Sequence, residues 1–269
     1  MTWGIIPAAG IGSRIQPLAF SKELLPVGCR IDEGVERPRA VSEYLIERMI
    51  LAGATKIAFV ISPTKSDIIE YFGGGIGDTR FAYVVQQQAG GLCDAIFQAL
   101  PLVCPERRSE SGALQLWDEP VLVGLPDTIW YPSHALAHLP DDRLSFLCFP
   151  VEEPQHFDAV VSEPDGRVRE IQVKVEAPSS HWVWGAFKLP AQVLRELHAL
   201  WLEPGRNDTY IGTLVNAWLA RGGRAYAAHD GTAYVDVGTL HGWRDAVHLL
   251  ERRPAEHVPR PYRSITAVR

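Results

Sequence analysis

Residues 3–28 read WGIIPAAGIGSRIQPLAFSKELLPVG, and this stretch decides the fold. The run Trp3–Ala8 carries no charged side chain, as expected of a strand that is buried on both faces. A loop containing Gly10 and Gly12 follows it. Glycines permit tight turns and let backbone N–H groups approach a phosphate, and Arg14 adds a cation whose planar group matches phosphate oxygens. The stretch therefore predicts a buried strand that leads into a phosphate-binding loop.

The loop differs from the two most familiar phosphate-binding motifs. Ile15 stands where the dinucleotide fingerprint has its third glycine, and no Gly-Lys-Ser/Thr follows, as a P-loop requires. Taken alone, the two glycines are equally compatible with a plain strand-to-helix turn that carries a surface arginine. The surrounding sequence has to distinguish these two interpretations.

Apolar runs and amphipathic segments alternate through the first half of the chain. The predicted strands are Trp3–Ala8, Lys56–Ile61, Phe81–Gln86 and Pro120–Leu125. The predicted helices are Ala40–Ala52, Ser66–Phe72 and Gly91–Leu100. Alternation of strands and helices implies a parallel sheet covered by helices. The polar segments 29–39 and 104–118 are interpreted as loops.

The second half has a less regular pattern, with turn signals such as Pro-Asp-Gly at 164–166 between apolar runs. The predicted strands are Leu144–Val151, Phe157–Ser162, Val168–Val173, Trp182–Leu189, Ala225–Ala228 and Ala233–Asp236. The predicted helices are Ala191–Leu202, Asp208–Arg221 and Leu240–Arg252. We expect one α/β domain over residues 1–269, with a Rossmann-like, mostly parallel sheet covered by helices and a smaller mixed β/α half that begins near residue 126.

Composition excludes several classes of protein. The net charge is −6 and no block of Lys and Arg stands out, which argues against a nucleic-acid partner. None of the four cysteines lies in a Cys-x-x-Cys pair, so reduced thiols in the cytoplasm are expected in place of a zinc site or a disulfide framework. The first residues lack a basic segment, and no apolar run is long enough to span a bilayer, so neither a signal peptide nor a membrane partner is expected.

Residues Gly4–Gly28 resemble the signature of sugar-1-phosphate nucleotidyltransferases, in which an apolar strand precedes Gly-x-Gly-x-Arg, a proline and Lys-x-Leu-Leu-Pro. The matching residues are Gly10, Gly12, Arg14, Pro17, Lys22, Leu24, Leu25 and Pro26. Ser13 stands where threonine is commoner. The Pro7-Ala8-Ala9 segment is closer to the UTP–glucose branch of the family than to the thymidylyl branch.

This resemblance implies roles for the first third of the chain. The loop residues that would bind the triphosphate are Ala9, Gly10, Gly12 and Ser13. The catalytic charges around the phosphorus under attack would come from Arg14 and Lys22. Gln86 and Gly91 match the base-recognition segment, and a glutamine amide offers both a donor and an acceptor to the edge of uracil or thymine. A polar strand end that caps a helix remains the alternative for Gln86.

Two aspartates match the acidic positions of the family. Asp127 follows a buried strand in Pro-Asp, where relatives have Gly-Asp, and Asp236 lies in a late Asp-x-Gly-Thr. By resemblance they are the ligands of Mg²⁺, which takes carboxylate oxygens and completes its shell with waters and phosphates. The alternative is that each is an ordinary turn aspartate.

The half that would bind the sugar matches the family less closely. Lys174 corresponds to a lysine that binds the sugar phosphate, and Gly185 to a glycine that lets the sugar approach the backbone. Asp158 follows Phe157 where Tyr-Gly is usual, and Val173 replaces a glutamate that contacts sugar hydroxyls. Lys174 is also compatible with an outward-facing position on a strand.

The expected activity is transfer of a nucleotidyl group from a nucleoside triphosphate, UTP or dTTP being favoured, to a sugar 1-phosphate, with release of pyrophosphate. Transfer to another phosphorylated acceptor, such as phosphocholine or a phosphonate, is an alternative. A catalytically inactive regulator that binds nucleotide sugars is another. The sequence leaves open which nucleotide and which sugar are used, and whether the protein is a homo-oligomer.

Overall fold

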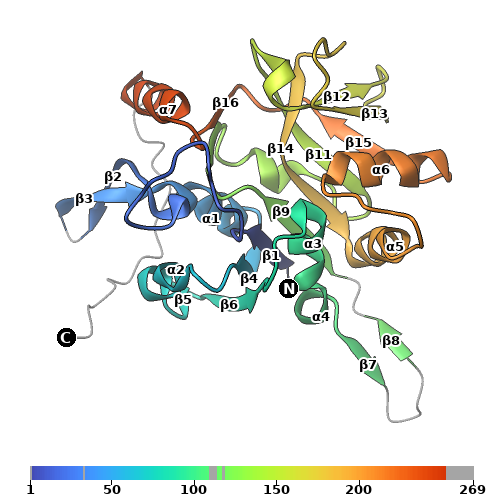
Figure 1. The fold of residues 1–269 in the computed structure, drawn as a ribbon, viewed down its shortest axis with the longest axis horizontal. Helices are drawn as coiled ribbons and strands as arrows, with labels where there is room; N and C mark the ends of the chain where they lie inside the picture. The colour runs from blue at the N-terminus through green and yellow to red at the C-terminus, as the bar shows by residue number, and fades with distance from the viewer. Residues whose placement is uncertain (1, 33, 109–113, 117–118, 253–269) are drawn as a thin grey trace.

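The computed structural model describes residues 2–32, 34–108, 114–116 and 119–252. Within those ranges, ten strands form one sheet in the order β13-β12-β14-β9-β1-β4-β6-β5, with β11 paired to β14 and β15 paired to β11. Helices cover both faces of this sheet (Figure 1). The predicted α/β class is therefore confirmed.

The centre of the sheet is parallel, as the continuous apolar runs predict. Its strands are β1 (Thr2–Pro7), β4 (Ala54–Ile61), β6 (Thr79–Val85) and β9 (Pro120–Gly124). β1 lies between β4 and β9, and Ile5 has Ala58 on one side and Val123 on the other. These three side chains are at most 1% exposed, so this row of the sheet lies in the core. The short β5 (Gly75–Ile76) closes the edge in antiparallel pairing with β6.

The strands of the second half are mainly antiparallel. They are β11 (Leu144–Pro150), β12 (Asp158–Ser162), β13 (Val168–Val173), β14 (Trp182–Pro190) and β15 (Ala225–Ala228). β14 pairs antiparallel with β9, and Ala186 lies opposite Gly124. The sheet therefore continues without interruption from the half predicted to bind the nucleotide into the half predicted to bind the sugar.

Helices divide between the two faces of the sheet. α1 (Val41–Leu51) and α2 (Ser66–Phe72) pack on one face. The helices of the other face are α3 (Gly91–Gln98), α4 (Leu100–Val103), α5 (Ala191–Trp201) and α6 (Ile211–Ala220). Figure 1 shows these two groups on opposite sides of the central strands. Short 3-10 turns lie at Lys22–Leu24, Ala135–His138 and Pro154–His156.

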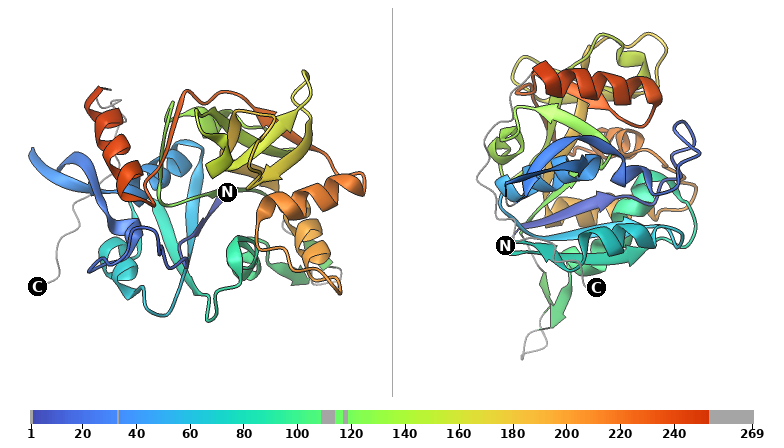
Figure 2. Two further views of the ribbon diagram at one scale, coloured as in Figure 1. Left: turned by 45° about the horizontal axis from the view of Figure 1, so that its top comes forward. Right: turned by 90° about the vertical axis from the view of Figure 1, so that its left-hand side faces the viewer.

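The last helix, α7 (Leu240–Arg252), lies apart from these two groups. It packs beside a hairpin from the N-terminal part of the chain (Figures 1 and 2). None of the helices in the described ranges has the length and apolar composition that crossing a bilayer requires.

The prediction of a loop over residues 29–39 is wrong. Residues 29–32 and 35–39 belong to a hairpin of β2 (Pro26–Asp32) and β3 (Val35–Ala40). Ile31 and Val35 are exposed at 54% and 50%, so the strands show no alternation of buried and exposed side chains. The buried Val27 packs in an apolar cluster at the base of the hairpin, and Arg30 forms an ion pair with Glu43 of α1 farther along it.

The loop predicted over 104–118 also needs correction in part. β7 (Glu106–Arg108) pairs with β8 (Leu114–Leu116) in a short antiparallel ladder. The rest of that prediction, at 109–113 and 117–118, lies outside the described residues. A further pair was not predicted, in which β10 (Thr128–Tyr131) runs antiparallel to β16 (Ala233–Asp236).

We predict that Ile5→Ala lowers the free energy of unfolding by about 2–5 kcal/mol, because it leaves a cavity in a row of the sheet that cannot collapse easily. The matched control is Ile69→Ala, since Ile69 lies on α2 with 39% of its surface exposed. Urea unfolding of both variants measures the difference. Equal losses in the two variants would show that β1 is not the rigid centre of the sheet.

Candidate active site

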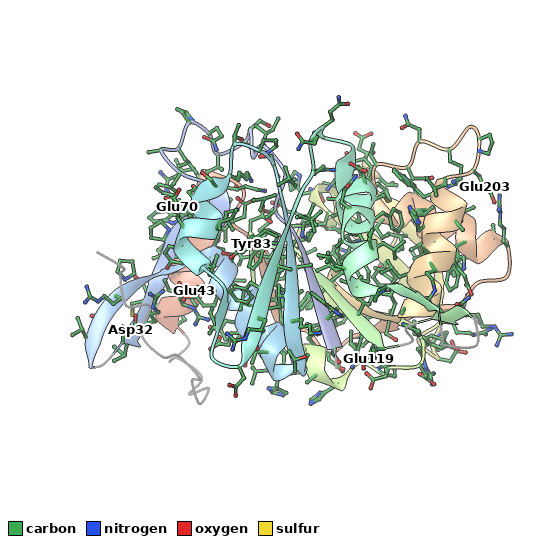
Figure 3. All side chains as sticks on the ribbon, turned by 90° about the horizontal axis from the view of Figure 1, so that it is seen from below. Asp32, Glu43, Glu70, Tyr83, Glu119 and Glu203 are labelled. Atoms are coloured by element: carbon green, nitrogen blue, oxygen red, sulfur yellow. The ribbon has the colours of Figure 1, made fainter. Side chains whose placement is uncertain are left out.

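The ends of the parallel strands gather the predicted site residues at one edge of the sheet. The glycine loop follows β1, Gln86 follows β6, and Asp127 lies three residues after β9. Glu119, which directly precedes β9, marks the opposite edge (Figure 3). In open α/β sheets the carboxyl edge is where ligands bind, because the connecting loops diverge there.

A buried lysine fixes the start of the glycine loop. The Lys65 Nζ donates to the carbonyls of Ala8 and Gly10 at 2.7 Å each, and to both carboxylate oxygens of Glu23 at 2.8 Å. Lys65 is 7% exposed and Glu23 is 1% exposed. Burial raises the pKa of Glu23, although the charge of Lys65 opposes this shift. This single ammonium ties the end of β1 to the turn that carries Lys22.

The structure pairs Lys22 with Asp127. The Lys22 Nζ lies 2.5 Å from Asp127 Oδ2, and both side chains are less than one-fifth exposed. Burial would lower the pKa of Lys22, but the charges of Asp127 and Glu23 outweigh burial and leave that pKa above its ordinary value. Burial likewise would raise the pKa of Asp127, but the charge of Lys22 leaves it below its ordinary value. Both groups are therefore charged at neutral pH.

A second ion pair lies beside the first. The Arg14 Nη2 lies 3.2 Å from Asp236 Oδ2, and the arginine is the more exposed partner. The backbone N–H of Gly238 donates to the other Asp236 oxygen at 2.7 Å. This hydrogen bond fixes one oxygen of the carboxylate while the guanidinium holds the other.

The pairing of β10 with β16 brings the two aspartates together. Thr128 lies opposite Asp236, and the Val237 N–H donates to the carbonyl of Asp127 at 2.8 Å. A Cβ added to Gly238 would lie 2.8 Å from Asp236 Oδ1, 3.3 Å from Asp127 Oδ2 and 3.1 Å from Arg14 Nη2. Both carboxylates and the guanidinium therefore converge on one point, where glycine leaves the room.

A cleft of about 450 Å³ opens over these charges. Its charged lining residues are Arg14, Lys22, Asp127, Asp158, Lys174 and Asp236, and its aromatic lining residues are Phe157, Trp184, Tyr210 and Tyr234. An adjoining groove of about 700 Å³ shares Arg14 and Asp236 with it. The predicted catalytic, metal-binding and sugar-phosphate-binding side chains thus face one common space.

Lys174 reaches this cleft from the end of β13. Its backbone has φ 52°, a left-handed conformation that is uncommon for a residue other than glycine. Its Nζ donates to the carbonyl of His156 at 2.8 Å and lies 3.7 Å from Asp158 Oδ1. Lys174 therefore lies after the strand, at the rim of the cleft, with its side chain about half exposed.

The comparisons with known proteins agree with this geometry. A nucleotidyl transferase family model matches residues 3–253. The chain belongs to this nucleotidyl transferase family. The protein is therefore an enzyme, and the resemblance found in its glycine loop is confirmed.

Individual relatives of this nucleotidyltransferase are distant, but their alignments cover most of both chains. A glucose-1-phosphate thymidylyltransferase of Mycolicibacterium smegmatis is 24% identical, and the alignment covers 96% of this chain and 86% of that protein. A UTP–glucose-1-phosphate uridylyltransferase of Mycoplasma pneumoniae is 23% identical over 89% of this chain and 88% of its own. The structure of a UTP-bound UGPase from Acinetobacter baumannii has a TM-score of 0.71 at 20% identity, and 95% of each chain is covered, so the two share a fold.

Three residues that were predicted to bind the base or the sugar contact other residues of the protein in the structure. Gln86 is 5% exposed and its amide nitrogen donates to Asp94. Gly91, with φ 88°, lines the cleft and packs against Thr209. Gly185 is buried, and a Cβ there would lie 2.6 Å from the Tyr234 ring and 2.7 Å from Phe149, so its lack of a side chain makes room for these rings.

The glycine loop itself combines buried and exposed positions. Ala9 is buried, whereas Gly10 and Ser13 are exposed. Gly12 has φ 70°, and a Cβ there would lie 2.7 Å from the Lys22 side chain. Glycine is needed at this position both for the turn and for the passage of the lysine stem.

The donor set of this nucleotidyltransferase fits a hard divalent cation that keeps other ligands of its own. Within the described ranges, no group of three or more His, Cys, Asp or Glu side chains is arranged to hold a metal ion. Asp127 and Asp236 supply two carboxylates that converge beside Gly238. Mg²⁺ is usually bound by one or two carboxylates together with waters and substrate phosphates, so two aspartates suffice.

We predict that Lys65→Met lowers the free energy of unfolding by about 3–5 kcal/mol, because it leaves the buried Glu23 carboxylate without its partner. A Lys65→Met/Glu23→Leu double variant recovers most of this loss, since no buried charge remains unpaired. Urea unfolding of the single and double variants gives the coupling free energy between Lys65 and Glu23.

The control for this cycle is Arg221→Met, which breaks the exposed pair with Glu203 (Figure 3). Exposed ion pairs contribute little to stability, so this variant is expected to unfold close to wild type. A loss as large as that of Lys65→Met would contradict the role assigned to the buried pair.

Proposed function

We propose that this enzyme transfers a nucleotidyl group from a nucleoside triphosphate, UTP or dTTP being favoured, to a sugar 1-phosphate, with Mg²⁺ as cofactor. The products are a nucleoside diphosphate sugar and pyrophosphate. The observation that carries the proposal is the convergence of Arg14, Lys22, Asp127 and Asp236 at the carboxyl edge of the sheet. The names of the relatives support the sugar 1-phosphate as acceptor.

The reaction is a single displacement at the α-phosphorus. An oxygen of the sugar phosphate forms a bond to that phosphorus while the bond to the pyrophosphate oxygen breaks, and pyrophosphate leaves. Because negative charge accumulates on the phosphoryl oxygens, Arg14 and Lys22 stabilise the transition state as cations already in place. Asp127 and Asp236 would hold Mg²⁺, which when bound neutralises charge on the phosphates.

The charges in the cleft are balanced before substrate binds. Two cations face two carboxylates, and each cation already has an anionic partner. Asp127 and Asp236 would hold Mg²⁺, and Lys22 and Arg14 would then be available to the phosphates of the triphosphate. The resting ion pairs thereby hold Lys22 and Arg14 in place without leaving a buried charge unpaired.

Gln86 matches the base-recognition segment of the family, and this match supports uracil or thymine as the base. The Gln86 Nε2 is held by Asp94, which in turn also accepts a hydrogen bond from Gln98 at 3.1 Å. The amide oxygen of Gln86 is thereby fixed as an acceptor. Uracil and thymine carry an N–H on the edge that pairs with an amide, whereas the same position in cytosine is an acceptor.

We predict that Lys22→Ala or Asp236→Ala lowers kcat by about 10²-fold or more, as removal of a preorganised charge does. The control is Lys56→Ala, since Lys56 lies near the amino end of β4, at the opposite edge of the sheet, over the Trp3 ring. The rate of pyrophosphate release is measured for all three variants. Turnover near wild type in Lys22→Ala or Asp236→Ala would remove that residue from the mechanism.

The decisive experiment is a matrix of nucleoside triphosphates against sugar 1-phosphates, read as pyrophosphate release with Mg²⁺ and with excess chelator. We predict activity with UTP or dTTP, loss of that activity in chelator, and a preference over CTP that falls in Gln86→Ala. Tight binding of nucleotide without pyrophosphate release in any combination would identify an inactive regulator and overturn the proposal.

A further inference from the structure

One buried arginine has no role in the mechanism above. Arg48 lies on α1 and is only 2% exposed. Burial, together with the charge of Arg39, lowers the pKa of Arg48 to about 10, so the group is still protonated at neutral pH. The Glu47 carboxylate lies 4.0 Å from Arg48 Nη1, which is too far for a hydrogen bond. A buried cation without a close anion is stable only if other acceptors take its hydrogens.

The acceptors are backbone carbonyls, and two of the three hydrogen bonds go to one strand. Arg48 Nε and Nη2 donate to the carbonyl of Trp130 at 3.1 and 2.6 Å. Nη1 donates to the carbonyl of Tyr44 at 2.8 Å, within the same helix. The guanidinium carbon also lies 4.9 Å from the centre of the Trp130 ring and 5.6 Å from that of Tyr131. Arg48 thus ties α1 to the middle of β10.

β10 connects the two predicted metal ligands. Asp127 directly precedes β10, and Asp236 is the last residue of β16. Within the described part of the chain, these two strands form a two-stranded sheet of their own, so β10 has a partner strand on one side only. Trp130 lies opposite Tyr234, two positions along the ladder from the pair of Thr128 with Asp236. A displacement of β10 would therefore move Asp127 relative to Asp236 and to the cations of the cleft.

Apolar packing also holds β10 against α1. Ile129 and Tyr131 lie in one buried cluster with Val41 and Tyr44. Such packing excludes water but is not directional, whereas a hydrogen bond requires a set distance and angle. The two bonds to the Trp130 carbonyl therefore fix the position of β10 along its own axis, which the apolar contacts alone do not.

We propose that Arg48 is a positioning residue that holds β10 so that Asp127 and Asp236 converge on one divalent cation. It touches neither carboxylate and acts through the Trp130 carbonyl and the β10–β16 ladder. A guanidinium suits this role, because its planar fork donates two bonds to one carbonyl and a third to Tyr44 in a fixed geometry. This inference rests on the proposed function for the identity of the metal ligands, and its test measures metal binding separately from catalysis.

The test measures Mn²⁺ binding to the full chain without substrates, from the electron paramagnetic resonance signal of the free ion. Mn²⁺ takes the same oxygen ligands as Mg²⁺. Arg48→Met removes all three donors and should raise the Mn²⁺ dissociation constant by about 10-fold or more, as loss of a group that orients metal ligands does. Arg48→Lys keeps the charge without the planar fork and should weaken binding by a smaller factor.

The matched control is Met49→Ala, since Met49 is a fully buried neighbour on α1 whose sulfur packs on Gly4 of β1. This variant leaves a cavity under the same helix but keeps the bonds to Trp130, so it should keep the wild-type dissociation constant. Asp236→Asn should lose most of the binding. Thermal melting confirms that each variant is folded. The Mg²⁺ concentration for half-maximal pyrophosphate release should rise in Arg48→Met by about the same factor as the Mn²⁺ dissociation constant.

A wild-type Mn²⁺ dissociation constant in folded Arg48→Met overturns the inference, and the same result in Arg48→Lys does so if Arg48→Met does not fold. An equal loss of binding in Met49→Ala, or no Mn²⁺ binding by wild type, also overturns it. In each of these cases, pyrophosphate release by wild type would still support the proposed function. Absence of pyrophosphate release in every combination overturns the proposed function, whereas weaker Mn²⁺ binding in Arg48→Met alone would still support the role of Arg48.

Discussion

The arrangement of the site depends on one buried ammonium. Lys65 is taken out of water among two loop carbonyls and the Glu23 carboxylate, and a cation is tolerated there only because each of its hydrogens has an acceptor. The contact joins the residues that follow β1 to the turn that begins at Lys22. The spacing between the glycine loop and the Lys22 amine is thereby fixed, and the lysine stem passes against Gly12, where no side chain stands in its way.

Two ion pairs between distant parts of the chain also organise the site. Lys22 comes from the first strand–turn unit and Asp127 from the end of β9, while Arg14 meets a carboxylate from the far end of the chain. Each charge is held in place by an opposite one, so that no group must be reoriented from solvent when a ligand arrives. Groups that are ordered in advance stabilise a transition state without a further cost in reorganisation free energy.

The fold could be predicted from the sequence where burial leaves a local pattern. The four parallel strands are apolar on both faces, and their runs mark them directly. The β2–β3 hairpin escaped prediction because most of its side chains are polar or exposed and no alternating apolar pattern marks its strands. β10 escaped because its four residues are buried against β16, a partner about one hundred residues later, and no local signal announces such a pairing.

The residues of the site also divide into those that the sequence indicated and those that it did not. Resemblance to a family pointed to Arg14, Lys22, Asp127 and Asp236, and the structure places them together. Lys65 and Glu23 were missed because a buried polar residue looks like a surface residue until its contacts are known. The roles predicted for Gln86 and Gly185 depend on contacts with a ligand, and they remain predictions.

The position of α7 has a consequence for the order in which the protein is made. Asp236 and Gly238 directly precede this helix, whose Trp243 indole donates to the carbonyl of Pro26 at 3.0 Å and whose Leu250 lies against Gly28. The start of the β2–β3 hairpin, which follows the turn that carries Lys22, is thus covered by a helix from a much later part of the chain. During synthesis the glycine loop is therefore made long before Asp236, and the ion pair between Arg14 and Asp236 cannot form until translation has passed β16.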